Sequence, residues 1–454
     1  MKLFKLKLTT LKSKLYAIVF ASFLVRIIGF FLLPNEPTVA LAPDEGGYAN
    51  IVRLIASEQP TTSHGGLYFI SRTLVIPASI LNNFGIEPLS SVRIIASMYG
   101  ALTLILVAFL IIQFVSKYST YSELTSKRSN LVIGLFFIFA FLPSHLLWSM
   151  LGLRESSMEF WVLCSFAAIF LGVNLQEKVT LPIALLLTIS VTLLFNTRPQ
   201  VAWVLVVTIL VSLIFSNKRR VSFTLALLTL IASGVGYTSI VLQKHDVFAL
   251  IATDGSATDG SACQLSNQII MLQGKEYKCI KTGTRRVLND FKNPAQILVD
   301  ETITISASHK SNQVAAASAI QTLSCPVTEE SKSDKYFCLA WRSPYMAATF
   351  LFRPLIGIDT TSTSSLIASV ENIVWLGAFV FIVVMLIKKR RLAFVAPLAP
   401  SLIFFVLYCV GAGSYEGNMG TAFRHKSLIL WVILLLVASA TVAEKRPKTR
   451  NESA

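Results

Sequence analysis

Two adjacent carboxylates, Asp44 and Glu45, stand shortly after the first long apolar run of the sequence. A carboxylate in such a place can act as a general base, taking a proton from a hydroxyl group as that hydroxyl attacks another molecule. It can instead serve structure, because an aspartate after Pro43 suits the N-cap of a helix and a glutamate in the first turn complements the helix dipole. The two roles are compatible, since a carboxylate held at a cap still accepts a proton.

Several arginines suit the binding of an anion. A guanidinium group presents a planar fork of donors that matches a phosphate and stabilises the charge on a departing one. Each could instead lie at the membrane interface or pair with a carboxylate. An arginine deep in a bilayer costs about 2.5–3.5 kcal/mol, so Arg26, inside the first run, needs a buried partner or an anion unless it reaches the interface. The candidates for a phosphate or sugar site are Arg26, Tyr48, Arg154, Glu155, Arg198, Arg353, Asn418, Arg424 and His425.

These side chains are set among long apolar runs, which identify an integral membrane protein. Apolar residues make up 54% of the chain and charged residues only 14%, whereas a soluble chain carries about 25% charged residues. A run of roughly 20 apolar residues spans the hydrocarbon core as a helix. The sequence therefore predicts an all-α polytopic fold with about ten transmembrane helices, at 15–33, 91–115, 130–150, 156–175, 180–196, 200–215, 221–242, 366–387, 392–412 and 427–443.

The net charge of +16 follows this topology and does not indicate a nucleic-acid partner. Lysines and arginines gather at alternate connections between the runs, and the positive-inside rule places those connections in the cytoplasm. Both termini are then cytoplasmic in a plasma (inner) membrane, and Asp44 faces the outside. Ala40-Leu41-Ala42 has the form of a signal-peptidase site, but the run before it is too long for a cleaved leader, so we expect the first helix to stay.

Three regions follow: an N-terminal membrane module at 1–242, an extracytoplasmic loop domain at 243–365, and a C-terminal membrane module with a basic tail at 366–454. The large loop begins with a tandem repeat at 252–261, whose composition predicts a flexible linker. Helical character is expected at 285–300 and 310–323, and irregular structure elsewhere in the loop.

The first outside loop, at 34–90, holds two further helical patterns. An amphipathic helix is expected from Glu45 to Ser57, with Tyr48 on its apolar face. The apolar stretch at 67–84 is expected to lie in the interface instead of crossing, because a crossing there would put the later basic loops on the wrong side.

Four cysteines lie in the large outside loop, in an oxidising compartment. Their order favours two disulfides, Cys263–Cys279 and Cys325–Cys338, although four cysteines allow three connectivities. Their spacing does not suit a zinc site. A divalent cation near the acidic pair stays open, and no other cofactor is expected.

The motif Pro43-Asp44-Glu45-x-x-Tyr48-Ala49-x-Ile51 resembles the first outside loop of the membrane-embedded GT-C glycosyltransferases, above all protein O-mannosyltransferases and the bacterial enzymes that move aminoarabinose onto lipid A. Arg26 and Arg93 also look like that superfamily, and the likeness covers roughly residues 15–175. It implies a polyprenyl-phosphate-linked sugar as donor, with Asp44 as base and Glu45 orienting the acceptor or binding a metal. Those families place a His/Lys-Pro-Pro element after the helix, whereas this chain has His64-Gly65-Gly66, so acceptor recognition differs.

A second likeness comes from later motifs. Gly152-Leu153-Arg154-Glu155, Phe352-Arg353-Pro354 and the stretch 416–425 resemble bacterial surface-polysaccharide membrane proteins, including O-antigen polymerase-like proteins. We therefore expect an inverting transferase that moves a sugar from a polyprenyl-phosphate carrier to an extracytoplasmic glycan, lipid or protein. The alternative is a polymerase or ligase of polyprenyl-diphosphate-linked glycan. A flippase would need charged or broken helices near the midplane, of which the runs offer few beyond Arg26 and Glu159, and no nucleotide-binding motif supports pumping.

Overall fold

The computed structural model describes residues 2–34, 43–57, 71–118, 126–175, 178–216, 218–241, 244–252, 257–259, 269–272, 275–286, 332–356, 363–389, 398–415 and 419–442. Asn418, Cys263 and Cys325 lie outside these residues, as do 287–300 and 310–323 of the two expected helices; residues 285–286 end a strand instead of starting a helix. Cys279 and Cys338 fall within a strand and a helix whose side chains are not described there. The two disulfides therefore stay predictions.

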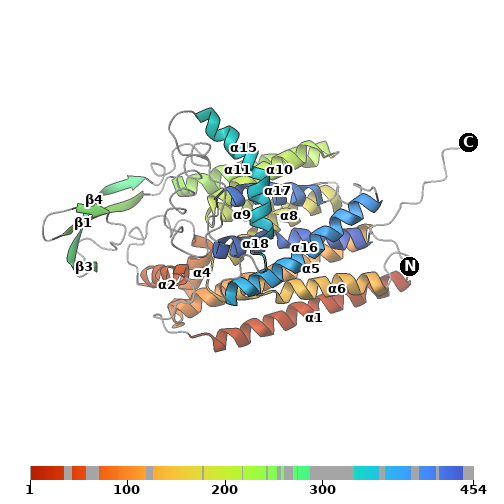
Figure 1. Ribbon diagram of the computed structural model, residues 1–454, viewed down its shortest axis with the longest axis horizontal. Helices are drawn as coiled ribbons and strands as arrows, with labels where there is room; N and C mark the ends of the chain where they lie inside the picture. Colours follow the sequence, from red (N-terminus) through yellow and green to blue (C-terminus); the bar gives the residue numbers. More distant parts are fainter. Residues whose placement is uncertain are drawn as a thin grey trace, which may run out of the picture.

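Each of the ten apolar runs forms a helix, and the chain has the architecture of an α-helical polytopic membrane protein (Figure 1). Among the described residues, seven helices are long and apolar enough to cross a membrane. Three apolar helices are shorter, at Leu181–Phe195, Pro199–Ile214 and Ala399–Gly413; fifteen residues extend only about 22 Å, against a hydrocarbon core of about 30 Å. The count of ten crossings therefore stays a prediction.

The helices that fill these runs are α1 (Lys2–Leu32), α5 (Pro88–Tyr118), α6 (Ser126–Phe141), α7 (Pro143–Met150), α8 (Glu155–Ile169) with the π-helix η2 (Phe170–Leu175), α9 (Leu181–Phe195), α10 (Pro199–Ile214), α11 (Arg219–Val241), α16 (Thr363–Lys389), α17 (Ala399–Tyr415) and α18 (Met419–Val442).

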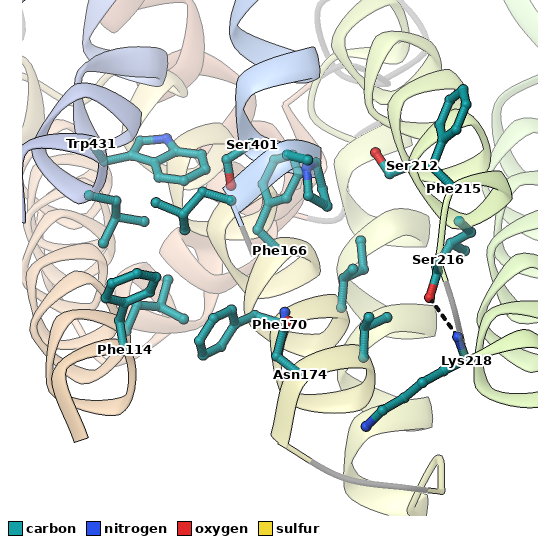
Figure 2. Close-up of a pocket in the computed structure, with 18 residues that line it drawn as sticks. Phe114, Phe166, Phe170, Asn174, Ser212, Phe215, Ser216, Lys218, Ser401 and Trp431 are labelled. Atoms are coloured by element: carbon teal, nitrogen blue, oxygen red, sulfur yellow. Dashed lines mark hydrogen bonds between the residues drawn. The ribbon is translucent and has the colours of Figure 1, made fainter. Parts of the chain in front are cut away.

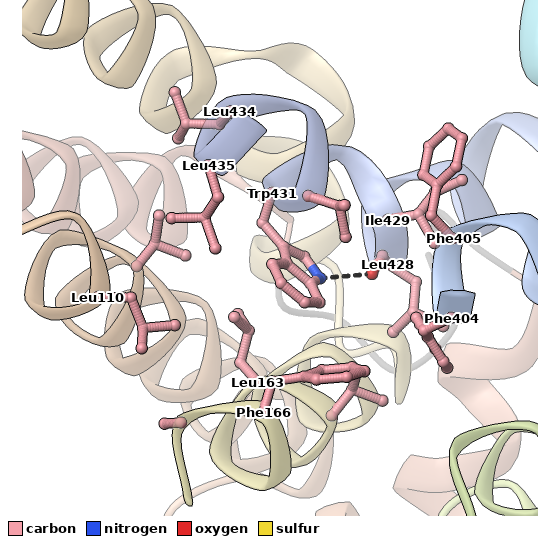
Figure 3. Close-up of a cluster of buried hydrophobic side chains, with 14 of the residues drawn as sticks. Leu110, Leu163, Phe166, Phe404, Phe405, Leu428, Ile429, Trp431, Leu434 and Leu435 are labelled. Atoms are coloured by element: carbon pink, nitrogen blue, oxygen red, sulfur yellow. Dashed lines mark hydrogen bonds between the residues drawn. The ribbon is translucent and has the colours of Figure 1, made fainter. Parts of the chain in front are cut away.

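Helix α18 is the centre of the bundle. A helix that is apolar on all sides is expected to be buried on all sides, and every residue from Leu428 to Ala438 is buried. Trp431 packs against Phe166 of α8, with ring centroids 5.3 Å apart, and its Nε1–H donates to the carbonyl of Leu428 at 2.7 Å (Figure 3). The first residues of this rigid helix carry Arg424 and His425, so the core fixes their position.

Two short helices cover the end of the bundle opposite the N-terminus (Figure 1). Helix α2 (Pro43–Ala56) is the expected amphipathic helix, and its apolar face, with Tyr48 and Ile51 fully buried, packs on α4 and α5. Helix α4 (Arg72–Asn83) has 12 residues, or about 18 Å, which is too short to cross. The interfacial or re-entrant position expected for 67–84 stays a prediction. The predicted N-cap is different, because α2 begins at Pro43 and Asp44 lies inside its first turn.

The large loop contains a sheet that the sequence did not predict. Strands β1 (Lys244–Ala252), β2 (Ala257–Asp259), β3 (Ile269–Leu272) and β4 (Lys275–Arg286) form an antiparallel sheet in the order β2-β1-β4-β3. The tandem repeat is therefore not a linker throughout, since Ala257–Asp259 pair with β1. A purely α-helical fold holds for the membrane part only. Later in the same region, α15 (Lys332–Phe352) packs against α17.

Candidate active site

Arg424 connects the first turn of α2 with the first residue of α8. Its Nη2 lies 3.3 Å from Oδ2 of Asp44, and its Nε lies 3.1 Å from Oε1 of Glu155. Glu155 is 3% exposed and Arg424 is 15% exposed, whereas the Asp44 side chain is 39% exposed. Asp44 is thus the side of this bridge that solvent can reach, and Glu155 anchors the other side.

His425 and Arg198 extend the cluster. Nη1 of Arg198 lies 2.6 Å from Nε2 of His425, which lies 3.4 Å from Oε1 of Glu155. Arg198 precedes Pro199, whose fixed φ suits the first turn of α10. The chain is therefore extended at Arg198, with φ −159° and ψ 97°, and its side chain turns toward α18. Three segments far apart in sequence meet at Glu155.

Arg154 and Tyr48 complete the cluster. Arg154 occupies the N-cap position of α8 and interacts electrostatically with Tyr48 and Glu155. Tyr48 is 0% exposed, and its hydroxyl has no hydrogen-bond partner among the described residues. A buried hydroxyl left in this state carries a desolvation cost that a bound ligand can offset. Burial raises the pKa of Tyr48, so its hydroxyl stays protonated and able to donate.

The charges of this outer cluster, which we define as Asp44, Tyr48, Arg154, Glu155, Arg198, Arg424 and His425, favour an anion. It has three arginines against two carboxylates, before any proton on His425 is counted. One positive charge in excess, in a partly dehydrated place, attracts a phosphate more strongly than the same charge in water. No group of three or more potential metal ligands occurs among the described side chains, so a divalent cation has no support from geometry within them.

Glu45 does not join the cluster. It is fully buried and forms a two-point ion pair with Arg93 of α5, in which Nη2 lies 3.1 Å from Oε2. The backbone N–H of Gly152 donates to its Oε1 at 3.2 Å, and Arg93 Nη1 donates to the carbonyl of Pro34 at 2.6 Å. Glu45 holds α2 against α5 and the 151–154 turn. The expected contact of Glu45 with an acceptor or a metal gains no support from this arrangement and stays a prediction.

Arg26 is also structural in its contacts. It is 1% exposed, Nε donates to Ser149 Oγ at 2.9 Å, Nη1 donates to the Ser22 carbonyl at 3.1 Å, and Glu159 is near enough to interact with its charge. Arg26 therefore has the buried partners that an arginine inside the bilayer needs when it binds no anion. Its place in a phosphate site gains no support.

The backbone of Arg353 connects this residue to the neighbourhood of the cluster. Its carbonyl accepts a hydrogen bond from Nζ of Lys426, the residue that follows His425. Lys426 Nζ also donates to Asn372 Oδ1 at 3.1 Å, and Asn372 Nδ2 donates to the Pro354 carbonyl at 2.9 Å. Sequence reasoning missed Asn372, although an amide in the middle of an apolar run is a signal of a polar contact.

A row of hydroxyl groups next to Arg198 was missed as well. Oγ1 of Thr73 lies 2.8 Å from Oγ1 of Thr197 and 3.3 Å from Oγ of Ser157, and all three residues are buried. Tyr99 donates to the carbonyl of Thr73 at 3.0 Å. Threonine and serine are too common for their sequence positions to have signalled this, and only the tertiary structure brings α4, α8 and the turn between α9 and α10 together here.

Comparisons with protein-family models, curated proteins and solved structures find no match to this chain. The likeness to GT-C enzymes thus remains a prediction that rests on the motif around Asp44. What the chain can do at its outer end follows from the geometry of the outer cluster.

Proposed function

We propose that the protein is an inverting glycosyltransferase that moves a sugar from a polyprenyl-phosphate carrier to an extracytoplasmic acceptor. The observation that carries this is the bridge from Arg424 to Asp44: a carboxylate that is 39% exposed adjoins a group of arginines with surplus positive charge. A transfer of this kind needs a base and a cation within reach of each other, because the proton leaves the acceptor while negative charge grows on the phosphate.

In the proposed transfer, every bond that breaks is matched by one that forms, and the cluster supplies a group for the proton and for the leaving phosphate. The acceptor oxygen attacks the anomeric carbon, a new carbon–oxygen bond forms, and the bond from that carbon to the carrier phosphate breaks. The phosphate leaves with the electron pair of the broken bond, and the acceptor proton passes to Asp44. The leaving phosphate is assigned to the three arginines of the cluster, Arg154, Arg198 and Arg424. Tyr48 donates a hydrogen bond from its hydroxyl group to the same phosphate. Glu155 is a positioning residue, since its oxygens contact Arg424 and His425.

The contact between Arg424 and Asp44 also fits a second candidate function. Arg424 contacts Asp44 directly, so Asp44 can also serve only to hold that arginine, as in a polymerase or ligase of polyprenyl-diphosphate-linked glycan. In that case the arginines carry the reaction and Asp44 is dispensable. The two candidates share the carrier phosphate and differ in the role of one carboxylate.

The experiment measures binding of polyprenyl phosphate to the full-length protein in detergent by native mass spectrometry. We expect Arg424→Gln and Arg154→Gln to weaken binding at least tenfold, because each removes a cation from the phosphate site. The matched control is Arg53→Gln, since Arg53 is exposed on α2 and contacts Asn50 instead of the cluster. Equal affinities for all three variants would reject the phosphate site and both candidate functions.

A further inference from the structure

A second site lies at the opposite end of the bundle. A cavity of about 470 Å³ lies between η2, the end of α10 and the start of α17, with α5 and α18 completing its wall. Its volume is within the range of about 300–1,000 Å³ that is usual for ligand sites. The first residue of α8 that lines it, Phe166, follows Glu155 by eleven positions, or about 16 Å along the helix, so the cavity is not part of the outer cluster.

The wall of this cavity is aromatic and apolar. Phe114, Phe166, Phe170, Phe215 and Trp431 line it, and Figure 2 shows Asn174 and Lys218 at the far end of the lining from Trp431. Phe215 is 78% exposed, which in a soluble protein would be a large uncovered apolar surface. The shape suits a hydrocarbon chain, which fills an aromatic slot without needing hydrogen bonds.

The polar end of the cavity is basic. Lys218 lines it, and Lys117 at the end of α5 is close enough to Lys218 for the two charges to repel. Nζ of Lys117 lies 5.6 Å from the ring of Tyr118, whose hydroxyl donates to Oδ1 of Asn174 at 3.1 Å. Two ammonium groups near each other at this end, one of them lining the cavity, favour an anion between them. Arg219 and Arg220, both exposed, add to the same charge.

We propose that this cavity binds an anionic phospholipid of the cytoplasmic leaflet, with one acyl chain against Trp431 and its phosphate between Lys117 and Lys218. Basic pockets between transmembrane helices on the cytoplasmic side bind anionic headgroups in this way. The positive-inside rule puts these lysines on that side. A phospholipid bound there ties η2 and α10 to α17, so it stabilises the bundle without entering the outer cluster.

The test uses phosphatidylglycerol with brominated acyl chains, because bromine quenches a tryptophan only in contact. The full-length protein in detergent is titrated with the lipid, and the signal of Trp431→Phe is subtracted to isolate Trp431. We expect saturable quenching of Trp431 with phosphatidylglycerol, and an affinity at least fivefold lower for brominated phosphatidylcholine of the same chains. Lys117→Gln with Lys218→Gln should remove that preference.

Two variants control for folding and charge. Lys12→Gln with Lys14→Gln removes two exposed cations from the start of α1 and should leave the quenching unchanged. Ser401→Phe fills the cavity and should abolish retention of phosphatidylglycerol, counted by native mass spectrometry on protein whose melting temperature in detergent without added lipid matches that of the wild type. The proposal is overturned if the two lipids quench equally, if the Lys117 and Lys218 variants keep the preference, or if the filled cavity retains the lipid.

Discussion

Nη2 of Arg424 lies 3.3 Å from Oδ2 of Asp44 across 380 positions of sequence. This contact joins the first outside loop to the last helix of the bundle. Because α18 is buried on almost every side, Arg424 is held from within the core, and α2 brings Asp44 to it. In the proposed reaction, this pair sets where a carrier phosphate and an acceptor hydroxyl meet.

Asp44→Asn separates the two candidate functions. The amide is the same size but is not a useful base, so in the glycosyltransferase sugar transfer should fall by about 10²–10⁴-fold while carrier binding stays within about threefold. The measurement is release of polyprenyl phosphate from its sugar conjugate in reconstituted membranes, with Arg53→Gln as control. Full activity of Asp44→Asn, together with inactive Arg424→Gln, would favour the polymerase or ligase.

Tyr48→Phe tests the role of the buried hydroxyl. Its oxygen has no hydrogen-bond partner among the described side chains, so its removal should leave the melting temperature unchanged or slightly raised. If the hydroxyl binds the carrier phosphate, KM for the lipid-linked sugar should rise about three- to tenfold, with kcat less affected. A fall in melting temperature with unchanged KM would mark the hydroxyl as purely structural.

The raised pKa of Tyr48 also predicts an effect of alkaline pH. The unfolded chain releases the tyrosine proton near pH 10, whereas the folded chain keeps it to higher pH. The folded state then binds more protons than the unfolded state, so its stability declines as pH rises above about 10. Melting temperatures of wild type and Tyr48→Phe should diverge above that pH, with the wild type losing more.

Glu45→Gln should destabilise the protein more than it affects chemistry. It leaves Arg93 buried and charged without its carboxylate, and breaking such a pair costs about 3–5 kcal/mol. We expect a clear loss of melting temperature in detergent. Replacing both members, as Glu45→Leu with Arg93→Leu, should recover part of the loss because apolar packing avoids the desolvation of both charges. If Glu45→Gln melts as the wild type does, the pair is not holding α2.

Gly413 and Gly411 of α17 form a matched pair for helix packing. A Cβ at Gly413 would lie 2.4 Å from the backbone oxygen of Met346 in α15, whereas one at Gly411 would meet nothing within 4 Å. Gly413→Ala should therefore cost about 1–3 kcal/mol. Gly411→Ala should be neutral or stabilising by up to about 1 kcal/mol, since alanine favours the helix. Melting temperatures of the two variants provide the comparison, and equal values would mean that α15 is free to move.

The positions of the helices were largely predictable from the sequence, whereas the contacts between side chains of different helices were not. The apolar face of α2 followed from the spacing of Tyr48 and Ile51, because periodicity acts within a few turns. The role of Glu45 did not, since a carboxylate beside Asp44 in sequence can turn either to solvent or to an arginine 48 positions away. The sheet was missed for the same reason: β1 pairs with β4 from Lys244↔Arg286 inward, and such pairing depends on distant residues.

The amino-acid sequence by itself determined that the chain is a membrane protein with apolar helices in these places, because burial of apolar surface and helical hydrogen bonding are decided locally. It also determined which polar residues stand at helix ends. Only the tertiary structure decided that Arg424 joins Asp44 to Glu155 and that Arg198 reaches Glu155 through His425, while Glu45 and Arg26 are held elsewhere. Side chains on separate helices meet according to how those helices pack, and packing depends on the whole bundle at once.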